Sequence, residues 1–144
     1  MTASSVGPVG IWSEKRTWAP DAVELRVGPY LAKFAIGNDE LAAALRLRFE
    51  VFNLELNEGL QSAYASGYDH DQFDAICDHL IVKHLPSQKT VGTYRLQTGI
   101  TAKENLGYYS QREFDFGTYE TLRPRLVELG RACIHHEHRS ADVL

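Results

Sequence analysis

The sequence has 144 residues, of which 44% are hydrophobic and 24% charged, a balance typical of one globular domain. Its net charge of −4 argues against non-specific nucleic-acid binding, which needs a basic surface. No apolar run approaches the roughly 20 residues of a membrane-spanning helix, and the N-terminus does not resemble a secretory signal. Cys77 and Cys133 indicate no disulfide framework, so a reducing cytoplasm is the expected location.

Residues 1–28 are expected to form a flexible tail because they carry Pro, Gly and Ser and no sustained apolar period. The first ordered element is then a strand over residues 30–36, a short, apolar and partly alternating segment. This places the start of the folded domain near residue 29.

An amphipathic helix is predicted from Asn38, whose side chain suits a helix N-cap, to about residue 56. Asp39 and Glu40 follow in the first turn, where the helix dipole favours acidic side chains. Apolar residues at spacings of four and three define one buried face: Leu41, Leu45, Phe49 and Phe52.

A long polar loop is expected over residues 57–72, followed by an antiparallel hairpin with strands at 77–84 and 90–98. Residues 99–125 are predicted to be irregular with a helical turn near 101–105, before a strand over 126–134. A helix could open at Ser140. This order predicts an α/β (α+β) fold with a largely antiparallel sheet and flanking helices.

Two clusters of charge stand out in the first half of the chain. Arg48 lies next to the apolar helix face, where an arginine commonly extends along the core to reach solvent. Asp69, Asp71 and Asp74 fall within six positions of the loop. They suit either a solvated loop or a site for a cationic substrate, whereas a calcium loop lacks its glycine and distal glutamate.

The second half holds the other candidate groups. Glu128 and Arg131 lie in an otherwise apolar strand, where strict alternation would put them on opposite faces. They indicate either an exposed edge strand or a sheet face that lines a pocket. Cys133 with three histidines, at 135, 136 and 138, suggests zinc, but the spacing matches no closed zinc motif and no metal is predicted.

Four segments taken in order resemble a known group of enzymes, the acyl-carrier-protein-using branch of the GNAT superfamily. That branch includes the acyl-homoserine lactone synthases and, with closer similarity, the ornithine N-acyltransferases and their hemolysin-like relatives. The segments that carry the resemblance are Arg48-Phe49-Glu50-Val51-Phe52, Asp69 to Asp74, Gly92-Thr93-Tyr94-Arg95-Leu96 and Glu128-Leu129-Gly130-Arg131. Residues 109–115 resemble the ornithine-type enzymes as well.

Two departures favour the ornithine-type enzymes. The lactone synthases carry a tryptophan soon after the first motif, where this chain has none, and a serine where this chain has Gly130. The resemblance also implies a longer domain, so residues 29–144 are expected to be its N-terminal portion, with the rest of the acyl-donor site missing.

The resemblance implies transfer of a fatty acyl group from acyl carrier protein, or from CoA, to the amino group of an amino acid such as ornithine. It implies no permanently bound cofactor and leaves room for peripheral contact with a membrane. It assigns catalytic roles to Glu128, as the base, and to Glu50 and Cys133. Substrate binding falls to Arg48, Phe52, Asp69, Asp71, Asp74, Arg95 and Arg131. The acids are implied to order the long loop and hold a cationic amino acid, and the arginines to position those acids or the substrate carboxylate. Donor binding falls to backbone groups of Ala132 and Ile134 and to the side chain of Arg139.

Two alternatives remain open at this point. One is an acetyl-CoA-dependent GNAT N-acetyltransferase, although the segment after residue 138 has no glycine for a pyrophosphate loop. The other is a catalytically inactive fragment that acts as a binding module.

Overall fold

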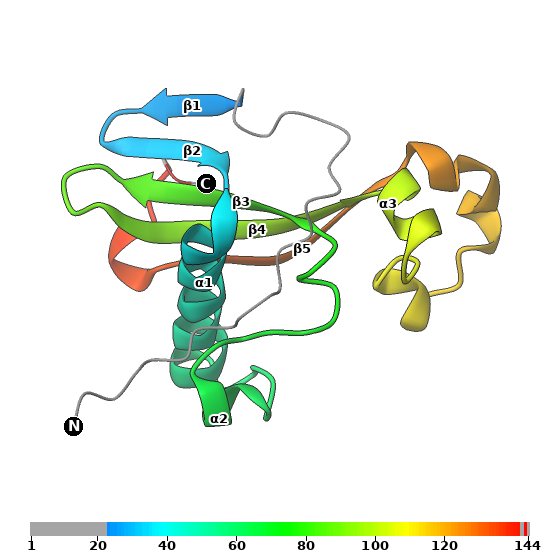
Figure 1. The fold of residues 1–144 in the computed structure, drawn as a ribbon, viewed down its shortest axis with the longest axis horizontal. Coiled ribbons are helices and arrows are strands. Elements are labelled where there is room, and N and C mark those ends of the chain that lie inside the picture. Colours follow the sequence, from blue (N-terminus) through cyan, green and yellow to red (C-terminus); the bar gives the residue numbers. More distant parts are fainter. Residues whose placement is uncertain (1–22, 142, 144) are drawn as a thin grey trace.

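A computed structural model of the chain describes residues 23–141 and residue 143. Its centre is one antiparallel sheet of five strands in the order β1-β2-β3-β4-β5 (Figure 1). The strands are β1 (Glu24–Val27), β2 (Tyr30–Phe34), β3 (Asp78–His84), β4 (Lys89–Thr98) and β5 (Val127–Ile134). The predicted fold class and the predicted hairpin of β3 and β4 are confirmed.

One helical segment packs against the sheet. Helix α1 (Gly37–Arg48) continues without a break into a π-helical turn (Phe49–Glu55), and α1 contacts β3, β4 and β5. Leu41 and Leu45 are 1% and 0% exposed, because the apolar face predicted from their spacing meets the sheet. The predicted helix is therefore confirmed along its length.

The start of α1 differs from the prediction. The N-cap position is Ile36, not Asn38, and no side chain caps it by the usual pattern. Instead the carboxylate of Glu40 accepts the backbone N–H of Ile36 at 2.9 Å. A first-turn acid thus satisfies one of the free N–H groups that every helix start leaves.

Part of the predicted tail is a strand. Glu24–Val27 forms β1 and pairs with β2, with Val27 opposite Tyr30. Gly28 makes the tight turn between them with a φ of +53°, a conformation that glycine adopts without steric cost. The tail prediction is wrong for this segment, and residues 1–22 of the predicted tail lie outside the described residues.

Residues 99–126, here called the projecting lobe, extend from the ends of β4 and β5 away from α1 (Figure 1). The lobe contains α3 (Gly99–Glu104) and two 3-10 segments, Ser110–Arg112 and Gly117–Arg125. The buried Tyr108 ties it together, since its hydroxyl donates to the Arg123 carbonyl at 2.6 Å. The predicted helical turn is present as α3, but the remainder is more ordered than expected.

The chain after β5 forms a single 3-10 turn (His136–His138). The helix predicted to open at Ser140 does not form in residues 140, 141 and 143, the described part of that segment. Within the described chain, α1 and the shorter helices all fall short of the length and apolar character needed to cross a membrane.

Truncating a side chain on the buried face of α1 should destabilise the domain. We expect Leu45→Ala to lower the free energy of unfolding by about 2–5 kcal/mol, since it removes contacts at a site with no access to water. Leu54→Ala is the matched control: that side chain is 60% exposed and its loss should change stability by less than about 0.5 kcal/mol. Urea denaturation followed by circular dichroism measures both, and equal effects would contradict the packing described.

Candidate functional site

The side chain of Arg48 lies at the end of α1 and is 0% exposed. Its Nε donates to Asp69 Oδ1 at 2.8 Å and its Nη1 donates to Asp74 Oδ1 at 2.7 Å. Both acids come from the long loop, and they are also buried. Arg48 therefore does not extend to solvent, and the solvated-loop interpretation of the acidic run is wrong for Asp69 and Asp74.

Two further arginines complete the cluster from the sheet. Arg95 on β4 donates from Nη1 to Asp71 at 2.7 Å and to Asp74 at 3.0 Å. Arg131 on β5 is held more loosely, with nitrogens 3.7 Å from Asp69 and 4.0 Å from Asp71. We call these three arginines and three aspartates the ion cluster.

The ion cluster keeps its buried members charged. Burial alone disfavours the charged form of Arg48, but Asp74 and Asp69 outweigh it and raise the pKa of Arg48 above its ordinary value. Burial would raise the pKa of Asp74, yet Arg48 and Arg95 outweigh it and hold that pKa well below its usual range. The formal charges of the ion cluster cancel, three positive against three negative.

This balance bears on one predicted role. The acids were expected to hold a cationic amino acid, but Asp69 and Asp74 are fully buried and already paired with arginine. They hold the loop to the arginines, in keeping with the predicted ordering of the loop. The most accessible cation of the cluster is Arg131, whose side chain is 20% exposed and lies over the ring of Phe52, with 5.6 Å from Cζ to the ring centroid.

A β-bulge directs Arg131 toward the candidate site. Arg131 has a φ of +50°, and the pairing of β4 with β5 shifts register between Thr93 and Arg95. The extra residue turns Arg131 to the sheet face that also carries Glu128 and Gly130. Glu128 and Arg131 therefore share one pocket, although strict alternation predicts opposite faces.

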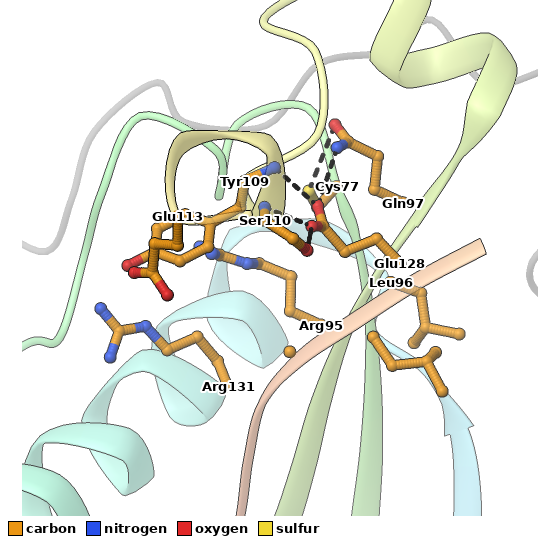
Figure 2. Close-up of a pocket in the computed structure, with 11 residues that line it drawn as sticks. Cys77, Arg95, Leu96, Gln97, Tyr109, Ser110, Glu113, Glu128 and Arg131 are labelled. Atoms are coloured by element: carbon orange, nitrogen blue, oxygen red, sulfur yellow. Dashed lines mark hydrogen bonds between the residues drawn. The ribbon is translucent and has the colours of Figure 1, made fainter. Parts of the chain in front are cut away.

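That pocket has a volume of about 310 Å³ and lies between β4, β5 and the projecting lobe (Figure 2). Arg95, Arg131 and Glu128 line it, as does Cys77, whose thiol has its pKa raised by burial to about 12. Figure 2 shows Glu113 and Arg131 with their charged ends facing each other across the opening. The pocket thus combines cations, a carboxylate and an opening to solvent.

Glu128 is anchored by four donors. One carboxylate oxygen accepts from the backbone N–H of Ser110 at 2.7 Å and from the Ser110 hydroxyl. The other accepts from the N–H of Tyr109 at 2.9 Å and from the Gln97 amide at 3.2 Å. These bonds hold the lobe against β5 and fix the direction of the carboxylate.

The sequence interpretation missed the pocket residues Gln97, Tyr109, Ser110 and Glu113 as site residues. Three of them lie in the segment 109–113, which is part of a stretch with ornithine-type similarity. The similarity was the available signal, but distance along the chain concealed that this segment meets Glu128.

The other two predicted catalytic residues lie elsewhere. Glu50 is outside the pocket lining and pairs with Arg46 on the exposed side of the helix, at 3.2 Å. Cys133 is buried against Leu47 and Val51, and burial raises the pKa of its thiol to about 12. A thiol of that kind is a core side chain and a poor nucleophile at neutral pH.

The predicted donor-binding residues follow the bulge. Ala132 is exposed directly after it, and Ile134 pairs with Gly92 at the end of β5. The Arg139 guanidinium makes two bonds to the Glu55 carboxylate, at 2.6 and 2.7 Å, and a third to the Ile134 carbonyl. Arg139 is therefore held beside the end of β5, with its charge already paired.

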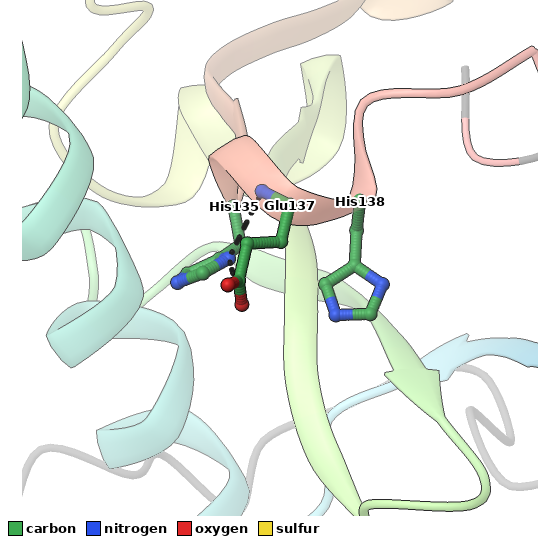
Figure 3. Close-up of side chains that lie close together, drawn as sticks. All are labelled: His135, Glu137 and His138. Carbon is green, nitrogen blue, oxygen red and sulfur yellow. Dashed lines mark hydrogen bonds and ion pairs between the residues drawn. The ribbon is translucent and has the colours of Figure 1, made fainter.

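His135, Glu137 and His138 gather beyond the end of β5 (Figure 3), with their potential ligand atoms within 4.8 Å of one another. Donors around tetrahedral zinc stand about 3.4 Å apart, given zinc–nitrogen bonds of about 2.1 Å. His138 is also engaged, because its Nδ1 lies 3.0 Å from the Tyr30 hydroxyl. We assign no metal to this cluster.

Comparisons with known proteins give a consistent result. A family model described as an acetyltransferase (GNAT) domain matches residues 47–144. The chain is 41% identical over 129 residues to the L-ornithine N(alpha)-acyltransferase of Brucella abortus, covering 83% of this chain and 46% of that protein. Proteins of the same name from Agrobacterium fabrum and Rhizobium meliloti are 37% and 35% identical. Each of these two matches includes 80% of this chain and 42% of the relative. The chain thus spans about half the length of these curated relatives. No solved structure shows a significant match.

The ion cluster should be intolerant of conservative change. We expect Arg48→Lys to lower the free energy of unfolding by about 3 kcal/mol, because one ammonium cannot serve two buried carboxylates as the guanidinium does. Arg46→Lys is the matched control, since that side chain is 52% exposed and its ion pair contributes less than about 1 kcal/mol. Thermal or urea denaturation gives the difference, and an Arg48→Lys protein as stable as the wild type would contradict the stabilising role of the buried ion pairs.

His79 should make stability depend on pH. It is 1% exposed, its Nε2 lies 3.1 Å from the Asp74 carbonyl, and burial lowers its pKa from 6.5 to about 4. Between pH 6.5 and 4, His79 therefore binds a proton in the unfolded chain but not in the folded chain. Stability is fully present above pH 6.5 and should fall by about 2–3 kcal/mol as the pH drops through that window.

His79→Gln keeps an amide donor for Asp74 but cannot titrate, so it should flatten this part of the profile. His70→Gln, at an exposed histidine, should leave the profile unchanged. Urea unfolding at a series of pH values measures all three proteins. A wild-type profile that is flat between pH 6.5 and 4 would disprove the assignment.

Proposed function

The chain belongs to the GNAT acetyltransferase family, and we propose that it forms part of an N-acyltransferase that joins a fatty acyl group to the amino group of an amino acid such as ornithine. The observation that carries the proposal is the pocket on β5, where a β-bulge brings the Arg131 guanidinium to the same side as the anchored Glu128 carboxylate. The names of the relatives, which match over four fifths of this chain or more, support ornithine as the acceptor.

The proposed reaction forms a carbon–nitrogen bond and breaks a carbon–sulfur bond. The substrate ammonium first loses a proton, and the free amine attacks the thioester carbonyl of the donor. The tetrahedral intermediate collapses and the thiol leaves with a proton. The proposed donor is the phosphopantetheine thioester of acyl carrier protein, with acyl-CoA as the alternative.

Three pocket residues have proposed roles in that sequence. Arg131 would bind the carboxylate of the amino acid, because it is the most accessible arginine of the ion cluster and arginine suits carboxylates. Glu128 would take the amine proton, received through the Ser110 hydroxyl that donates to it. Glu113, which faces Arg131 across the opening, would attract the second ammonium group of ornithine.

The proposed donor side lies after the bulge. Ala132 and Ile134 belong to the outermost strand of the described sheet, and backbone N–H groups of such a strand can stabilise a developing oxyanion. Arg139 would bind the donor phosphate once its ion pair with Glu55 breaks.

The test is an acylation assay on the purified chain and on the same protein extended to the length of its relatives. Each is mixed with long-chain acyl carrier protein and ornithine, and products are identified by mass spectrometry. We expect N-acylornithine, with kcat about 100-fold lower in Glu128→Gln. Arg131→Gln should raise KM for ornithine about tenfold by removing a charge-assisted bond. Glu24→Gln and Arg26→Gln on β1 are the matched controls and should change neither constant.

The outcomes separate the candidate functions. Transfer from acetyl-CoA alone would identify an acetyltransferase and contradict the proposal. Product only from the longer protein would keep the reaction but make this chain an inactive part of it. If neither the chain nor the longer protein forms product while both are folded, the proposed reaction is wrong.

A further inference from the structure

Two more cavities continue from the pocket toward the projecting lobe. The nearer one, of about 240 Å³, shares Ser110, Glu128 and Leu129 with the pocket. The farther one, of about 450 Å³, shares Ser110, Phe116 and Leu126 with the nearer one. Cavities that share lining residues are neighbours, and we call the three together the depression. We call the part beyond the pocket the apolar groove.

The residues that line this depression change from charged at one end to apolar at the other. The pocket is lined by charged groups that include Arg95, Arg131 and Glu128. The farther end of the groove is lined mainly by Phe114, Phe116, Tyr119 and Leu126, and among its described lining residues Asp115 is the one charged group. A ligand that fills both parts must be polar at one end and apolar at the other.

The groove leaves large apolar side chains in contact with water. Phe114 is 67% exposed, Tyr119 is 54% exposed, and Val127 and Leu129 on β5 are 55% and 52% exposed. Contiguous apolar surface of this kind usually marks a binding site. Ser110, Glu128 and Leu129 line both the groove and the pocket, so this surface lies next to the proposed reaction centre.

The order of features along β5 gives the direction of the ligand. Leu126 and Val127 border the groove, Glu128 and Arg131 border the pocket, and Arg139 follows the strand. A thioester carbonyl in the pocket would thus have the proposed phosphate site on one side and the groove on the other. The five residue steps from Leu126 to Arg131 span roughly 16 Å of strand, far more than an acetyl group occupies.

We infer that the apolar groove holds the aliphatic chain of the acyl donor, so that the projecting lobe selects long acyl groups over acetyl. This inference rests on the proposed acyltransferase function. It assigns Phe114 and Tyr119 to recognition of acyl-chain length and leaves the bond-forming chemistry to the pocket.

The test measures donor binding, which needs no acceptor and no turnover. Acetyl-CoA, octanoyl-CoA and palmitoyl-CoA are titrated into the purified chain by calorimetry, each below its micellar concentration. We expect affinity to rise by about fourfold for each methylene that the groove buries. Phe114→Ser and Tyr119→Ser should weaken palmitoyl-CoA binding by about tenfold or more while acetyl-CoA binding stays unchanged.

Ile100→Ser is the matched control, because Ile100 is a 58%-exposed apolar residue of the same lobe that does not line the groove. Unchanged chain-length dependence in Ile100→Ser, with its loss in Phe114→Ser, supports the inference. Equal affinity for the three donors in the wild-type chain overturns it, as does equal weakening in Ile100→Ser, which would indicate non-specific adsorption. Failure of the acylation assay with chain-length dependence intact would reject the proposed reaction alone.

Discussion

The buried pairing of Arg48 with Asp69 and Asp74 is the constraint on which the rest of the structure depends. An arginine without access to water is tolerated only when carboxylates surround it, and the carboxylates are tolerated only when cations face them. The ion cluster therefore ties the end of α1, the long loop, β4 through Arg95 and β5 through Arg131 into one arrangement. Arg48, Asp69 and Asp74 cannot move without leaving a buried charge unpaired.

The same constraint determines what the site can bind. Because the charges within the ion cluster cancel, the acids of the loop leave no net negative charge in it. What remains accessible is the loosely held guanidinium of Arg131, which lines the same pocket as the anchored carboxylate of Glu128. Arg48 and Arg95 hold the loop, and Arg131 is the arginine to which the proposed function gives ligand recognition.

The sequence was informative where the local pattern decides the structure. The spacing of Leu41 and Leu45 predicted α1, and alternating apolar strands around a polar turn predicted the hairpin of β3 and β4. It was uninformative where distant residues decide. Composition favoured a solvated Arg48, because its partners lie more than twenty residues away. The alternation of side chains along a strand predicted the wrong sheet face for Arg131, since a bulge depends on the pairing of two strands.

The projecting lobe begins and ends at residues that face each other, since Thr98 pairs with Val127 and the N–H of Gly99 donates to the Leu126 carbonyl at 3.0 Å. Within the sheet, the lobe is the connection of the hairpin formed by β4 and β5. The length of this connection has little effect on the stability of the sheet, because doubling a flexible loop adds only about 0.6 kcal/mol of closure entropy. Insertions, deletions and exchanges in this segment can accumulate during evolution while the five strands and their ion cluster persist. Divergence among related proteins is therefore expected to concentrate in the lobe outside Tyr109, Ser110 and Glu113, which contact Glu128 or line the pocket.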